Sequence, residues 1–153
     1  MAVFFRLSTG GKLLAKKAVD TIKETLELIP LMKSKFGITR NRDSCDELLY
    51  TGVAQSDVID ELSQEVAKYF GSPYKAKGDG AFWANWFDSF VKSVGGIESD
   101  QTLYKKEISE TVTMYCAFWP WGSNPVKTSV RIGVLCSDDK ERSGLAKELK
   151  GSF

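Results

Sequence analysis

The fold is decided by residues 103–136, which read LYKKEISETVTMYCAFWPWGSNPVKTSVRIGVLC. Apolar and polar side chains alternate along both halves of this stretch. Because successive side chains of a strand point to opposite faces, this alternation predicts a long β-hairpin. We expect strands over residues 104–119 and 126–136, joined by a tip at residues 120–125. The apolar parity holds Ile108, Val112, Met114, Cys116, Phe118, Val126, Val130, Ile132, Val134 and Cys136.

The other parity of the hairpin is mostly polar. It carries Glu107, Thr113, Lys127, Ser129 and Arg131. An antiparallel pair with one apolar and one polar face packs its apolar face on a core and leaves the other in water. We therefore expect the helices of the chain to pack on one face of the hairpin.

The segments outside the hairpin are mainly helical by their periodicity. Apolar residues recur at helical spacing over residues 12–29, 56–70, 81–94 and 138–150. Residues 2–7 alternate instead, which predicts a short strand added to the sheet. The order of segments favours an α+β fold: a small antiparallel sheet, made by an N-terminal strand and the hairpin, with about four helices on one face. We expect residues 1–153 to form a single domain.

Composition excludes several classes of function. The chain has no histidine, so Ser-His-Asp and Cys-His catalysis and most zinc or haem ligation are excluded. No secretory signal and no membrane-length apolar run is visible, which predicts a cytoplasmic protein with no membrane contact. Three cysteines at unrelated spacings predict free thiols. We expect no cofactor and no metal, although the acidic residues between positions 43 and 61 leave a single Mg²⁺ or Ca²⁺ as an alternative.

Residues 82–90 form an unusually aromatic helix. Phe82, Trp86 and Phe90 share one stripe at 3.6 residues per turn, and Trp83 and Phe87 flank it. One interpretation is that all five rings pack against the apolar face of the hairpin. The other is that Trp83, Trp86 and Phe87 line a pocket or an interface, because large aromatic residues are enriched at interfaces.

The hairpin tip carries a second aromatic feature. Trp119 falls on the polar parity and Trp121 lies in the tip itself. Either the two indoles fold back over the aromatic helix, or they are exposed and stack on a ligand or a second subunit. The spacing does not select between these alternatives.

Residues 40–46 are the most polar stretch and hold candidate anion ligands. Arg40 and Arg42 have guanidinium groups that bind phosphate or carboxylate in a bidentate manner. The alternative is a solvated loop in which these arginines pair with nearby aspartates. Cys45 lacks a histidine that would activate it as a nucleophile.

The first 42 residues are basic, with nine Lys and Arg against three Asp and Glu. Stacking of single-stranded nucleic acid on the tip would use this charge. The net charge of the whole chain is only +1, which argues against nucleic acid as the main partner.

These features favour a non-enzymatic binding protein that uses the aromatic helix and the tip, residues 118–122. A protein partner is expected first, and a homodimer is its simplest form. A small anionic ligand is a further expectation. The alternatives are a histidine-free enzyme or phosphate-handling protein that uses residues 40–46, with Asp43, Asp79 or Glu110 as acid or base, and a single-strand binder.

Overall fold

A computed structural model describes residues 4–122 and 125–153, with side chains from residue 15 onward. The helices are α1 (Phe4–Leu26), α2 (Leu28–Phe36), α3 (Ile59–Phe70), α4 (Phe82–Phe87), α5 (Ser89–Ser93) and α6 (Asp139–Glu148), with 3₁₀ turns η1 (Arg42–Ser44) and η2 (Ser56–Val58). The strands are β1 (Thr39–Arg40), β2 (Leu49–Gln55), β3 (Thr102–Glu107), β4 (Val112–Pro120) and β5 (Lys127–Cys136).

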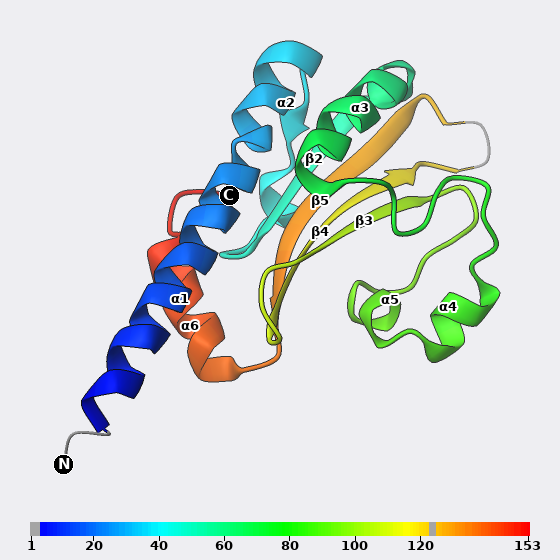
Figure 1. The fold of residues 1–153 in the computed structure, drawn as a ribbon. Coiled ribbons are helices and arrows are strands. Elements are labelled where there is room, and N and C mark those ends of the chain that lie inside the picture. The colour runs from blue at the N-terminus through cyan, green and yellow to red at the C-terminus, as the bar shows by residue number, and fades with distance from the viewer. Residues whose placement is uncertain (1–3, 123–124) are drawn as a thin grey trace.

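The five strands form one antiparallel sheet in the order β1-β2-β5-β4-β3. This arrangement confirms the α+β class and the small antiparallel sheet. The pairing of β4 with β5 is the predicted hairpin, and it places Met114 opposite Val134 and Cys116 opposite Ile132. Helices α1, α2, α3 and α6 lie on one side of the sheet, while α4 and α5 lie on the other (Figure 1).

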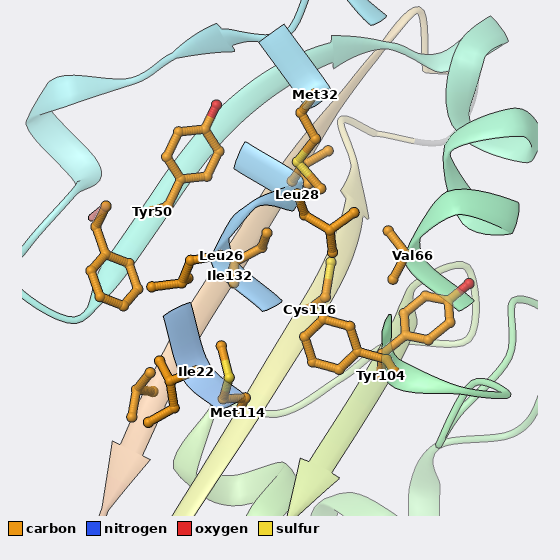
Figure 2. Packing of buried hydrophobic residues seen from close by; sticks show 14 of the residues in the cluster. Ile22, Leu26, Leu28, Met32, Tyr50, Val66, Tyr104, Met114, Cys116 and Ile132 are labelled. Carbon is orange, nitrogen blue, oxygen red and sulfur yellow. The ribbon is translucent and has the colours of Figure 1, made fainter. Parts of the chain in front are cut away.

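The main core lies between the sheet and α1, α2, α3 and α6. Figure 2 shows Ile22 and Leu26 of α1 and Met32 of α2 facing the sheet side chains. The predicted apolar parity supplies the sheet side of this core, since Met114, Cys116, Phe118, Val130, Ile132 and Val134 are all buried. Thr128 shares that parity, and its hydroxyl is satisfied by the Ser56 hydroxyl at 2.8 Å. The alternation therefore identified the correct core face.

The opposite face of the sheet is also partly covered, contrary to the expectation that helices pack on one face only. Tyr115 and Ala117 of β4 and Leu103 of β3 are buried there against Phe90, Val91 and Val94. Among the polar residues of that parity, Thr113 and Ser129 lie near strand ends, whereas Arg131 lies opposite Ala117 in the middle of the sheet, so this face is partly apolar and partly polar.

The predicted strand at residues 2–7 is wrong. Residues 4–7 belong to α1, which continues through Gly10 and Gly11, while residues 2 and 3 lie outside the described residues. Glycine in a helix interior costs about 1 kcal/mol relative to alanine, a small penalty within a 23-residue helix. A three-residue alternation is too short to separate a strand from one turn of helix.

The predicted strand 104–119 is folded in two at Ser109. The Ser109 hydroxyl accepts hydrogen bonds from the amides of Thr111 and Val112, at 3.3 and 3.2 Å. Serine side chains that bond to nearby amides stabilise turns in this way. Strands β3 and β4 are therefore a hairpin of their own, and Glu110 lies exposed in their turn. Helix α2 ends at Gly37, which adopts φ 64° as its left-handed cap.

Gly133 provides a direct test of sheet packing. Its cross-strand partner is Tyr115, and a Cβ added at Gly133 would lie 2.5 Å from Tyr115 Cε1. Gly133→Ala should destabilise the protein by about 1–3 kcal/mol, because the buried ring has to shift. Urea unfolding measures this change in free energy.

Gly144→Ala is the matched control, since Gly144 lies in α6 with nothing within 4 Å of an added Cβ. This substitution should be neutral or stabilise the protein by up to about 1 kcal/mol. Equal effects of the two substitutions would contradict the packing of Tyr115 over Gly133.

Candidate functional site

Four large aromatic side chains of α4 are exposed together. We call Phe82, Trp83, Trp86 and Phe87 the aromatic cluster; their exposed fractions lie between 63% and 74%. The rings contact one another: Phe82 and Trp83 meet edge to face at 5.3 Å, and Trp83 stacks on Phe87 at 5.6 Å between centroids. The cluster is thus a continuous aromatic surface in contact with solvent.

The one polar side chain of α4, Asn85, is half-buried and fixed by hydrogen bonds. Asn85 donates from Nδ2 to the carbonyl of Ile97 and accepts from the Ile97 amide at Oδ1, both at 2.7 Å. This pair of bonds engages both the donor and the acceptor end of the amide group and joins α4 to the segment before β3. The helix therefore half-buries its polar residue and exposes its four aromatic ones, which reverses the usual arrangement of an amphipathic helix.

Lys75 anchors the base of the same segment. Its side chain is only 6% exposed, and Nζ donates to the carbonyls of Glu98, Ser99 and Gln101 at 2.7, 2.8 and 2.7 Å. The backbone of Lys75 also pairs with Leu103 at the start of β3. Burial lowers the pKa of the Lys75 ammonium, and the three carbonyls take all three of its donors. The bonds of Lys75 therefore tie the start of the segment 75–101 to its end.

Asp88 breaks the predicted helix 81–94 into α4 and α5. Its carboxylate accepts from the amides of Phe90 and Val91 at 2.9 and 3.2 Å, which makes it the N-cap of α5. The Tyr74 hydroxyl donates to the same carboxylate. Burial acts to raise the pKa of Asp88, but these hydrogen bonds outweigh it and hold the pKa below its ordinary value.

The break at Asp88 separates two kinds of aromatic residue. Phe90 is buried in the second core, where its ring meets Tyr74 at 5.3 Å, whereas the aromatic cluster stays outside. The expectation that all five rings cover the hairpin therefore holds for Phe90 alone.

The two tryptophans of the tip lie on the same sheet face as α4 and α5. Trp119 is half-buried against the second core, with the Arg131 guanidinium 4.0 Å from its ring centroid. Its indole N–H has no partner among the described residues and is shielded from solvent. Trp121 is 52% exposed and donates to the Ser129 hydroxyl at 2.8 Å. Trp119 lines a pocket with Asn85 and Lys92, so the structure brings the tip and α4 close together.

Arg40 and Arg42 converge on one pocket at the other edge of the sheet. The carboxylates considered with them do not gather there. Glu110 lines a separate pocket beside α5, and neither Asp43 nor Asp79 is among the residues around the arginines. Within the described part of the chain, no group of three or more acidic or cysteine side chains is placed to hold a metal ion.

The three cysteines are free thiols. Cys116 is fully buried, and burial raises the pKa of its thiol far above the ordinary value. Cys45 donates to the Asn41 carbonyl at 3.1 Å and accepts from the Thr51 amide at 3.3 Å, which suits a structural role in the turn before β2.

A scan against protein-family models, a search of curated proteins and a search of solved structures each found no match to this chain. Over residues 4–122 and 125–153, no helix has the length and apolarity needed to cross a membrane. Function is therefore inferred from the residues of this chain.

The hydrogen bonds of Asn85 generate the first prediction for the site. Asn85→Ala leaves the amide and carbonyl of Ile97 without partners, which costs about 1–3 kcal/mol in that segment. Hydrogen exchange of the Ile97 amide and of α4 should speed up by about tenfold or more, while the amides of β4 and β5 keep their protection.

Asn41→Ala is the control, because no hydrogen bond of the Asn41 side chain is found among the described residues and its backbone bonds are unaffected. Unchanged exchange at Ile97 in Asn85→Ala would show that this side chain does not hold α4.

Proposed function

We propose that this chain is a non-enzymatic binding protein whose partner surface is the aromatic cluster of α4. The observation that supports this proposal is the reversed amphipathicity of α4: its rings are exposed while Asn85 is held inside by two hydrogen bonds. Contiguous exposed aromatic surface is a feature of interaction sites. Because the helix is already fixed, binding costs little ordering of the backbone.

The chemistry of the cluster suits an apolar protein surface. Tryptophan and other large aromatic residues contribute most of the binding energy at many interfaces, since each buries a large area and has few rotatable bonds. The indole N–H groups of Trp83 and Trp86 can donate hydrogen bonds to polar groups of the partner. Residues 82–87 carry no charge, so a partner meets no ionised group that must lose its water.

A second copy of the chain is the simplest partner. An isologous dimer places the same surface on both sides, and two uncharged α4 helices meet without repulsion. Four rings that each offer about 150–250 Å² when fully exposed give roughly 400–700 Å² per copy at the exposure observed. This area lies below the roughly 800 Å² per partner of a stable interface, so the dimer should be weak unless neighbouring residues join it.

Trp119 and Trp121 border the proposed surface. They lie on the α4 and α5 side of the sheet, and Trp119 shares a pocket with Asn85. We propose that they form its rim, with Arg131 and Lys127 stacked on their rings as the adjacent polar groups.

Self-association tests this proposal directly. In sedimentation velocity over about 10 to 1,000 µM, the wild-type chain should shift from monomer toward dimer, consistent with a weak interface. The double substitution Trp83→Ser and Trp86→Ser should raise the dissociation constant by about tenfold or more, because it removes two large apolar side chains from the interface. Its unfolding free energy should change little, since both side chains are exposed.

Trp121→Ser is the comparison variant, because it removes one exposed indole from the rim and none from α4. It should weaken association less than the double substitution. A wild-type chain that stays monomeric over the whole range contradicts self-association. A fluorescent apolar dye that binds the wild type no better than the double variant contradicts the binding surface itself.

A further inference from the structure

A second candidate site lies at the opposite edge of the sheet from the aromatic cluster. It is a pocket of about 730 Å³ between α2, β1, β2 and the last residues of the chain. A pocket of this size suits a small molecule. Strand β1 forms one edge of the sheet, and the segment that carries α4 is attached to β3 at the other edge. The pocket is thus independent of the proposed partner surface.

Three cationic side chains line this pocket: Lys33 of α2, Arg40 of β1 and Arg42 of η1. No aspartate or glutamate is among the lining residues. Within the described residues, no acidic group lies within 4 Å of any of the three, whereas Lys35 and Lys68 are both paired with glutamates. The three positive charges of the pocket are therefore available to a ligand.

Tyr50 supplies a polar group from the core side of the pocket. Tyr50 is only 2% exposed, yet it lines the pocket. Figure 2 shows its hydroxyl pointing away from the core side chains. Among the described residues the Tyr50 oxygen has no hydrogen-bond partner, and it is not enclosed in the way the indole nitrogen of Trp119 is, so it opens onto the pocket and can donate to a ligand. Burial raises the pKa of Tyr50, so the hydroxyl remains a donor at neutral pH.

Gly52 keeps space beside this hydroxyl. A Cβ at Gly52 would lie 2.8 Å from the Tyr50 oxygen and 2.6 Å from Ile38 Cγ2. A side chain at this position would displace the phenol. The apolar part of the pocket is formed by Ile29, Pro30 and Phe153.

We propose that this pocket binds a phosphomonoester attached to an apolar or aromatic body. Arg40 and Arg42 bind the phosphate oxygens through their guanidinium groups, Lys33 adds a third charge, and the Tyr50 hydroxyl donates the remaining hydrogen bond. Three cations match a dianionic phosphate better than a singly charged carboxylate. The apolar wall contacts the body of the ligand. This site goes beyond the proposed function and does not depend on it.

Phenyl phosphate is the probe that tests this site, with inorganic phosphate and benzoate as comparison ligands. Chemical shifts and calorimetry should show saturable binding of phenyl phosphate, with weaker binding of both comparison ligands. The double substitution Arg40→Gln and Arg42→Gln should weaken phenyl phosphate binding by about tenfold or more. Tyr50→Phe, which removes only the oxygen, should weaken it by about three- to tenfold.

The double substitution Lys77→Gln and Arg142→Gln removes the same charge outside the pocket and should change binding by less than about twofold. Thermal unfolding checks that each variant is folded. The proposal is overturned by an absence of saturable phenyl phosphate binding, or by equal losses in the two charge variants. Benzoate binding as tightly as phenyl phosphate would contradict the phosphate assignment, and inorganic phosphate binding as tightly would contradict the role of the apolar wall.

Discussion

The hydrogen bonds of Lys75 and Asn85 fix the segment that carries α4 to the start of β3. A buried ammonium needs acceptors for its three protons, and the carbonyls of residues 98, 99 and 101 provide them. The half-buried carboxamide of Asn85 likewise has both a donor and an acceptor to satisfy, and the backbone of Ile97 provides a partner for each. Turning α4 over would break both Asn85 bonds and leave the polar groups of Asn85 and Ile97 unpaired, at about 1–3 kcal/mol for each group that stays buried. These bonds therefore favour the orientation of α4 in which the aromatic cluster faces solvent.

The sheet gives this segment a rigid base. The core on the α1, α2, α3 and α6 side is closed by Met114, Cys116 and Ile132, and the smaller core on the other side holds Tyr115, Ala117 and Phe90. Both depend on the same two strands, β4 and β5, with opposite parities. A surface carried on such a base changes shape little when a partner binds.

Alternation along β4 and β5 was sufficient to predict the class of fold and one core face, because side-chain parity is a local property of a strand. Three features needed information that is not local. The turn at Ser109 depends on one hydroxyl that bonds two amides. The break at Asp88 depends on a capping carboxylate within a continuous apolar pattern. The burial of Lys75 depends on carbonyls more than twenty residues away, and lysine is rarely buried.

The aromatic residues of the candidate site were identifiable from composition, but their exposure was not. Arg40 and Arg42 were identifiable by type, whereas Tyr50 and Lys33 join them only through the packing of α2 and β2.

The central claim is that the rings of α4 are in water while Trp119 is sheltered. The chain has four tryptophans, so four indole N–H resonances are expected. A soluble paramagnetic agent, added at a protein concentration low enough to keep the chain monomeric, measures the solvent access of each one. Strong relaxation of Trp83 and Trp86 and weak relaxation of Trp119 is the predicted result. Protection of Trp83 and Trp86 at that concentration would contradict an outward-facing aromatic cluster.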